Sequence, residues 1–198
     1  LSFRCSVLRC MRRARAVASP PGHDELWGRL EQLLPVLRER AARCEELRRM
    51  TDETLRDFHD TGLFRMQQPR RVGGSELDFV AVVTFGALAA RACASSAWNL
   101  VNLGAHHLLL AMFPPKVQDE VWGASPDTLV ASSFVFPAGR AKPVKGGYVL
   151  SGRWPFSSGV DPSDWDMLAG QVTVAEGAPP EPRIFMVHRS QYQVHDTW

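Results

Sequence analysis

The hydrophobic pattern of the chain changes character near Ser125, and this change constrains the fold more than any other feature. Before Ser125, apolar residues recur at the spacing of helices; after it, short apolar runs alternate with glycine and proline turns, as between strands. Helices followed by strands favour segregated layers over an alternating strand–helix–strand sheet. We therefore expect an α+β fold, with a helical domain at residues 23–127 and a β domain of sandwich or barrel type at residues 128–198.

Four or five helices are predicted in the first domain. Leucines at helical spacing predict a helix over residues 23–50, which Pro35 should kink or divide because proline has no backbone N–H. Thr51 and Gly62 are a start and a stop signal for a short helix between them. Ser75–Asp78 is a capping signal for a segment that is apolar almost all round and should be buried. The helices predicted after residue 50 are Asp52–Asp60, Phe79–Ala94, Ala97–Met112 and a segment from the Pro114–Pro115 pair to Trp122. Trp98 and Trp122 are expected in the core.

The second domain is predicted to consist of short strands. Gly146 and Gly147 precede an apolar run and indicate a hairpin with a glycine turn. Residues 175–182 are rich in proline and glycine and are expected to form a loop. The predicted strands are Thr128–Phe136, the hairpin strand at Tyr148–Leu150, Met167–Val174 and Ile184–Val187.

The charge distribution separates the first residues from the rest. Residues 1–21 contain five arginines and no acid, whereas the remaining chain has 18 basic and 21 acidic side chains. The body of the protein is therefore mildly acidic and has no basic surface that would indicate nucleic-acid binding. We expect residues 1–22 to be a disordered basic tail or an upstream extension with Met11 as the true start, and a transit peptide is the alternative.

Several classes of site and location have no support in the sequence. The four cysteines form no C-x-x-C pair and join no zinc pattern, which favours a reduced, cytoplasmic protein without a structural metal. The longest apolar run, Phe79–Ala90, is shorter than the roughly 18 residues of a membrane span. The glycine-rich nucleotide motifs and the signatures of zinc proteases and serine hydrolases do not occur.

The most informative stretch is residues 147–159, which read GYVLSGRWPFSSG. It combines a strand, aromatic residues and paired hydroxyls, and from composition alone it would be taken for a solvated turn. The stretch resembles the segment of acyl-CoA dehydrogenases in which a strand ends beside the flavin ring. Its GRWPFSSG portion is closer to the flavin-dependent phenol hydroxylases, which include p-hydroxyphenylacetate hydroxylase oxygenase components and secosteroid phenol hydroxylases.

Three other segments resemble the same family in order and spacing. Gly62–Arg65 with Pro69–Gly74 is similar to the "GLF…P…GG" segment of its N-terminal helical domain. Gly104–His106, followed by Phe113 and Pro114, resembles the helix that brings a histidine to the flavin in the hydroxylases. Ala131–Phe134 resembles the first strand of the β domain. The resemblance covers about residues 24–198.

The resemblance implies the oxygenase component of a two-component monooxygenase. Such a protein takes reduced FMN or FAD from a separate flavin reductase and hydroxylates a phenol with oxygen through a C4a-hydroperoxyflavin. By resemblance, Ser157 lies at flavin N5, Ser132 lies on the peroxide or O4 side, and His106 orients the phenol or the peroxide. The residues expected at the flavin are Ser132, Ser133, Trp154, Phe156, Ser157 and Ser158. The alternatives are serines that cap backbone groups, a hydrogen-bonded core histidine, and ordinary packing of the two aromatic rings.

The chain departs from this family at its C-terminal end. The family continues with a helical bundle that closes the flavin site and builds a homo-oligomer, a tetramer in the family. Without that bundle the β domain is incomplete, and we expect exposed apolar surface, self-association and low solubility. Two other functions remain open: an acyl-CoA dehydrogenase that oxidises an acyl thioester with FAD, and an inactive fragment with only an association role. Against the first, Phe134–Pro137 stands where dehydrogenases show an acidic "TEP" pattern.

Overall fold

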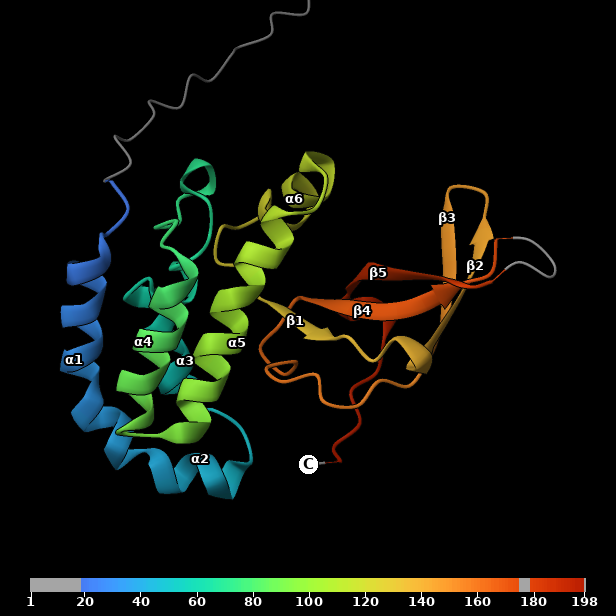
Figure 1. Ribbon diagram of the computed structural model, residues 1–198. Helices are drawn as coiled ribbons and strands as arrows, with labels where there is room; N and C mark the ends of the chain where they lie inside the picture. The colour runs from blue at the N-terminus through green and yellow to red at the C-terminus, as the bar shows by residue number, and fades with distance from the viewer. Residues whose placement is uncertain (1–18, 175–178, 198) are drawn as a thin grey trace, which may run out of the picture.

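The computed structural model describes residues 19–174 and 179–197, and in these residues a group of helices precedes a sheet (Figure 1). Residues 1–18 of the expected tail and residues 175–178 of the expected loop lie outside the described part. The helices are α1 His23–Glu39, α2 Ala41–Leu47, α3 Asp52–Asp60, α4 Phe79–Ala90, α5 Ala94–Ala111 and α6 Pro115–Trp122. The strands are β1 Val130–Ser133, β2 Gly139–Val144, β3 Gly147–Gly152, β4 Trp165–Val172 and β5 Glu181–His188.

Local signals set several helix ends as predicted. The Thr51 hydroxyl accepts a hydrogen bond from the backbone N–H of Thr54 at 3.2 Å and starts α3. Gly62 follows the end of α3 with a φ of 78°, a conformation that suits glycine. Asp78 is the N-cap of α4, and its carboxylate accepts from the N–H of Ala81 at 3.2 Å. Pro115 is the first residue of α6.

Pro35 does not divide the first helix. It lies inside α1, which continues to Glu39, and a new helix begins at Ala41. The leucines around it explain why the helix is kept: Leu30 and Leu37 are almost fully buried on one side of α1. Packing of that apolar face outweighs the loss of one backbone hydrogen bond.

The prediction that residues 79–94 form one helix buried all round is wrong. The segment divides at residues 91–93, and only one side of α4 packs against α1 and α5 (Figure 1). On the other side, Phe79, Val80 and Val83 are 57%, 63% and 62% exposed. An apolar sequence thus marks a face that a partner could cover, and this exposed face agrees with the expected apolar surface. Self-association stays a prediction.

The five strands form one mixed sheet in which β4 is central. β1 and β2 both pair with β4 in the parallel direction, while β5 pairs with its other edge in the antiparallel direction. β2 and β3 form the predicted hairpin, with Gly146 at a φ of 86° in the turn. No α-helix lies between two strands in the described residues, so the helical and sheet layers are segregated as expected.

A small apolar cluster joins the two layers. Leu110 of α5 and Trp122 of α6 pack with Val130 of β1 and Met167 of β4, and all four are almost fully buried. Trp122 is therefore in the core as predicted, whereas Trp98 is 60% exposed and the prediction for it was wrong. The cluster fixes α5 against the sheet, and the candidate site lies beside it. The division into separately folding domains at residues 127 and 128 stays a prediction.

Candidate active site

His106 and Ser132 are brought into direct contact where α5 meets β1. The Nε2 atom of His106 lies 2.9 Å from the Ser132 hydroxyl, and its Nδ1 atom lies 2.6 Å from the carbonyl oxygen of Val130. Because a carbonyl oxygen only accepts, Nδ1 carries the ring proton, so Nε2 accepts the hydrogen bond from Ser132. Burial lowers the pKa of His106, with the bond to Val130 as the opposing influence, and this favours the neutral imidazole.

The neighbouring histidine has a different environment. His107 is 1% exposed and stacks on Trp122 with ring centroids 5.8 Å apart. Neither ring nitrogen has a hydrogen-bond partner among the described residues. Burial, with a smaller contribution from nearby charges, lowers the pKa of His107 to about 3. His107 therefore points away from Ser132, as the helical rotation of about 100° per residue predicts.

Ser157 makes its own pair on the other side of β4. Its hydroxyl donates a 2.8 Å hydrogen bond to Oδ2 of Asp166, a side chain that is only 3% exposed. Burial raises the pKa of Asp166 to about 6, and the bond from Ser157 opposes that rise. The second carboxylate oxygen, Oδ1, has no hydrogen-bond partner among the described residues. Asp166 was not among the predicted site residues, because no local sequence pattern marks it.

The two pairs lie on opposite faces of the central strand. Ser132 stands in register with Met167, and Asp166 is the preceding residue of β4. Successive side chains of a strand point to opposite faces, so Ser157 and Asp166 lie across the strand from Ser132. The structure brings His106 and Ser132 together, and it does not place Ser157 in contact with them.

Helix α5 nevertheless connects both regions. The Trp98 indole N–H donates to the Ser158 hydroxyl at 3.0 Å. A side chain at Gly159 would lie within 3 Å of Leu103, so the backbone there packs directly against α5. Leu103 is one helical turn before His106. The segment that carries Ser157 is therefore anchored on the same helix as His106.

The other residues expected at a flavin have defined places in the fold. The Ser133 hydroxyl donates to the Pro155 carbonyl at 2.6 Å, and the Trp154 indole N–H donates to the Ala169 carbonyl at 2.7 Å. Phe156 has a φ of 60°, which is unusual for a bulky residue, and its ring is 78% exposed. Ser133 and Trp154 thus hold the segment to the sheet, while Phe156 projects from it.

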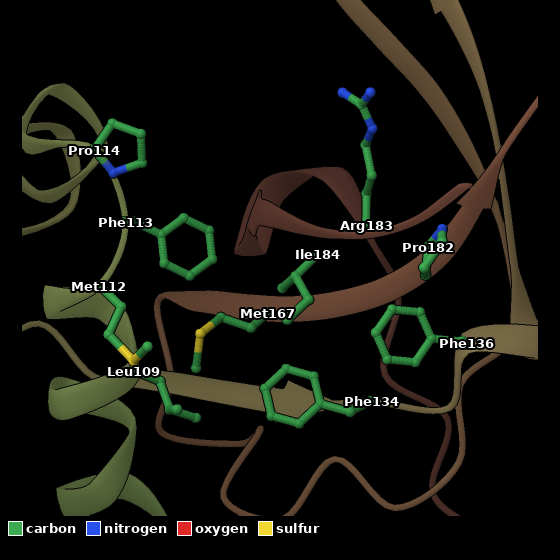
Figure 2. Close-up of a pocket in the computed structure, with 10 residues that line it drawn as sticks. All are labelled: Leu109, Met112, Phe113, Pro114, Phe134, Phe136, Met167, Pro182, Arg183 and Ile184. Atoms are coloured by element: carbon green, nitrogen blue, oxygen red, sulfur yellow. The ribbon is translucent and has the colours of Figure 1, made fainter. Parts of the chain in front are cut away.

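An apolar pocket of about 540 Å³ lies between the end of α5 and the sheet (Figure 2), and several of its lining residues are close neighbours of His106 and Ser132 in the fold. Leu109 follows His106 by one turn, Phe134 directly follows the end of β1, and Met167 stands in register with Ser132. The guanidinium of Arg183 points away from the apolar side chains in Figure 2 and bonds to the Tyr148 hydroxyl at 2.8 Å. The remaining lining residues are Met112, Phe113, Pro114, Phe136, Pro182 and Ile184. This pocket was not predicted from the sequence, although Phe134 and Phe136, two aromatic residues at alternate positions, were a signal for it.

The described part of the chain has neither a cluster of metal ligands nor a membrane-spanning helix. Its His, Cys, Asp and Glu side chains form no group of three or more that could hold a metal ion. None of its helices has both the length and the apolar character that a membrane span requires.

Comparison with known proteins shows what this chain is similar to. Residues 31–122 match the model of the acyl-CoA dehydrogenase N-terminal domain. Over 170 residues the chain is 38% identical to the oxygenase subunit HsaA of a flavin-dependent monooxygenase from Rhodococcus jostii, a match that covers 86% of this chain and 44% of the relative. It is 35% identical over 188 residues to the oxygenase component of an FADH2-dependent resorcinol hydroxylase from a Rhizobium strain, covering 95% and 46%.

A solved structure gives the same result. The HsaA monooxygenase from M. tuberculosis superposes with a TM-score of 0.86 at 35% identity, covering 90% of this chain and 48% of that one. The chain thus spans about half the length of these relatives. Over most of its length it is similar to part of the oxygenase components of flavin-dependent hydroxylases, and its helical region is similar to the N-terminal domain of acyl-CoA dehydrogenases.

Proposed function

We propose that the chain is the N-terminal part of the oxygenase component of a two-component, flavin-dependent monooxygenase that hydroxylates a phenol. The observation that carries the proposal is the His106–Ser132 pair beside an apolar pocket, in a chain similar to HsaA and to a resorcinol hydroxylase component. The pair provides polar groups that orient a hydroxyl, and the pocket provides an apolar surface for the rest of an aromatic molecule.

The residues present fit a flavin. Ser132 and Ser157 are half-buried hydroxyls whose protons are directed at His106 and Asp166, so each oxygen keeps lone pairs that can accept from an N–H at the edge of a flavin ring. Asp166 Oδ1 is a buried polar atom without a partner among the described residues, and Phe156 presents an exposed ring from a strained backbone. We assign Ser132, Ser133, Trp154, Phe156, Ser157 and Ser158 to the binding of reduced FMN or FAD.

The protein's own residues would hold and move the phenol proton. Bound reduced flavin supplies the electrons and the site at which oxygen is activated. The Ser132 oxygen has lone pairs free to accept a hydrogen bond from a phenol, while its own proton is directed at His106 Nε2. A proton can therefore pass from the phenol oxygen to Ser132 and from Ser132 to Nε2. The lowered pKa of His106 keeps this acceptor unprotonated at neutral pH.

The proposal includes partners that a two-component system requires. A flavin reductase supplies the reduced flavin, and a phenol occupies the apolar pocket. Assembly as a homo-oligomer is supported by the exposed apolar face of α4, formed by Phe79, Val80 and Val83. A cytoplasmic location is part of the same proposal, and it is supported by the free thiols of Cys44 and Cys93.

A binding and turnover experiment tests the proposal. The purified chain is titrated anaerobically with reduced FAD and reduced FMN, with and without a monohydric phenol, and is then exposed to oxygen. We expect the chain to bind reduced flavin and the phenol, and to form a catechol after oxygen is added. His106→Ala and Ser132→Ala should weaken the binding of the phenol. Ser151→Ala, which changes an exposed serine on β3, is the matched control. If neither reduced flavin nor the phenol binds, the proposal is wrong for this chain.

A further inference from the structure

The hydrogen bond between Ser157 and Asp166 has a direction, and that direction limits what Ser157 can do for a ligand. An ionised carboxylate only accepts, so the Ser157 proton is directed at Oδ2 of Asp166. The hydroxyl oxygen then has only lone pairs left for any third group. Ser157 is thus fixed as an acceptor as long as Asp166 is charged.

The two redox states of a flavin differ in whether N5 donates or accepts a hydrogen bond. Reduced flavin carries a hydrogen on N5 and donates there, whereas oxidised flavin has a lone pair on N5 and only accepts. If the Ser157 oxygen can only accept, it forms a hydrogen bond with the N5–H of reduced flavin. With oxidised flavin, the lone pair of the Ser157 oxygen faces the lone pair on N5. Two acceptors facing each other in a half-buried site lose a hydrogen bond and gain repulsion.

We propose that Asp166 is a positioning residue that makes the site selective for reduced flavin, by holding the Ser157 hydroxyl as an acceptor toward N5–H. This inference rests on the proposed function, because it takes Ser157 as the residue at N5. It goes further in assigning a role to a buried carboxylate that acts through the Ser157 hydroxyl. The free, buried Oδ1 atom leaves Ser157 as the only hydrogen-bond partner of this carboxylate among the described residues.

The charge of Asp166 is maintained under physiological conditions. Burial raises its pKa to about 6, which leaves the group ionised at neutral pH and protonated at pH 5. The Tyr192 hydroxyl approaches it from the C-terminal segment; burial and then the Asp166 charge raise the pKa of that tyrosine to about 12. Arg189 and Asp164 lie close to Tyr192. On β4 and β5, Trp165 and His188 face each other on the opposite side of the sheet.

The test compares the affinities for the two redox states. Dissociation constants for oxidised FAD and for anaerobically reduced FAD are measured at pH 8 by equilibrium dialysis. We expect the wild-type chain to prefer reduced FAD. In Asp166→Asn the amide N–H₂ donates to Ser157 and frees its proton for N5, so the preference should shift toward oxidised FAD by about tenfold or more. Asp161→Asn makes the same chemical change at an exposed side chain and should shift nothing.

If Asp166→Asn acted only by removing a charge, the preference between the two redox forms would shift in the opposite direction. Removing a negative charge would favour reduced flavin, the more negative of the two forms. A shift of Asp166→Asn toward reduced FAD, or no shift relative to Asp161→Asn, therefore overturns the inference. So does an equal shift when Ser157→Ala is combined with Asp166→Asn, because the effect must pass through the Ser157 hydroxyl.

A pH series tests the same inference on the unmodified chain, without the Asp166→Asn variant. Between pH 8 and pH 5 the preference for reduced FAD should fall as Asp166 is protonated, and Ser157→Ala should remove this fall while retaining the flavin's own ionisation. If both redox forms bind, and the ratio of their dissociation constants changes neither with pH nor in Asp166→Asn, only this inference fails. If neither form binds any variant, the proposed function and this inference fail together.

Discussion

The two serine pairs on either face of β4 look alike but respond to burial in opposite ways. Ser132 donates to His106 and Ser157 donates to Asp166, at 2.9 Å and 2.8 Å. Burial opposes charge in both partners, so it lowers the pKa of His106 and raises that of Asp166 to about 6. At neutral pH the histidine is neutral and the aspartate is still charged. The same hydroxyl donor thus faces a base that can take a proton on one side, and a fixed anion on the other.

The largest expected effect on stability comes from a buried side chain on the His106 side of β4. Met167 is fully buried in the cluster between the helices and the sheet. Met167→Ala should lower the free energy of unfolding by about 2–5 kcal/mol, because it removes apolar contacts and leaves a cavity. Urea denaturation followed by circular dichroism measures the change. Leu108→Ala, at a position that is 37% exposed, is the control. Equal losses in the two variants would mean that the cluster does not hold the layers together.

Acid sensitivity should come from the histidine beside that face. The pKa of His107 falls from 6.5 to about 3 on folding, so its contribution is complete above pH 6.5 and is lost as the pH falls. Between pH 6.5 and 5 this loss is about 2 kcal/mol, from 1.4 kcal/mol per pH unit. His107→Phe should remove that part of the pH dependence, measured by urea unfolding at both pH values. His195→Phe, an exposed change, should not. If wild type and His107→Phe lost the same amount of unfolding free energy between pH 6.5 and 5, His107 would not be the source of the acid sensitivity.

The aspartate should show the reverse pH dependence. The pKa of Asp166 rises from 3.8 to about 6 on folding, so the folded state loses stability as the pH increases through this window. Asp166→Asn should therefore raise the free energy of unfolding by about 1–3 kcal/mol at pH 8 and by little at pH 4. Unfolding curves at the two pH values, with Asp161→Asn as reference, measure the difference. A gain of equal size at both pH values would exclude ionisation of Asp166 as its cause.

The smallest expected effect is the loss of a single hydroxyl from each pair. Ser132→Ala and Ser157→Ala should each lower the free energy of unfolding by about 0.5–1.5 kcal/mol, the net contribution of one hydrogen bond. Ser157→Ala should lie at the upper end, because it leaves a buried charge without its partner. Thermal unfolding compares both with Ser151→Ala. A larger loss of stability in Ser132→Ala than in Ser157→Ala would contradict the expectation that the bond to the charged Asp166 is the stronger of the two.

Features set by neighbouring residues could be predicted from the sequence. Thr51 and Gly62 bracket α3, Pro115 starts α6, and Gly146 turns the hairpin, because capping and turn geometry depend on a few adjacent residues. Pro35 and α4 were misjudged for a different reason. The outcome there depends on which faces are packed, and that is decided by distant parts of the chain.

The candidate site shows the same division. His106 and Ser132 could be named from the family resemblance, and the structure places them in contact. The partner of Ser157 could not, since Asp166 becomes its neighbour only through the packing of the segment after β3 against β4. The pocket likewise depends on the parallel pairing of β1 and β4, which no local pattern encodes. The roles of Ser157, Ser158 and Phe156 at a flavin stay predictions.

The parallel pairing of β1 with β4 also sets an order of events for a newly made chain. The helices and the β2–β3 hairpin join residues close in sequence, so they can form as soon as they leave the ribosome. β1 has to wait, because its hydrogen-bonding partner is synthesised only after the whole hairpin. Pairing across such a separation is slow. During that interval the edge of β1 lacks the strand that covers it, so the contact between Ser132 and His106 is among the last to be fixed in place.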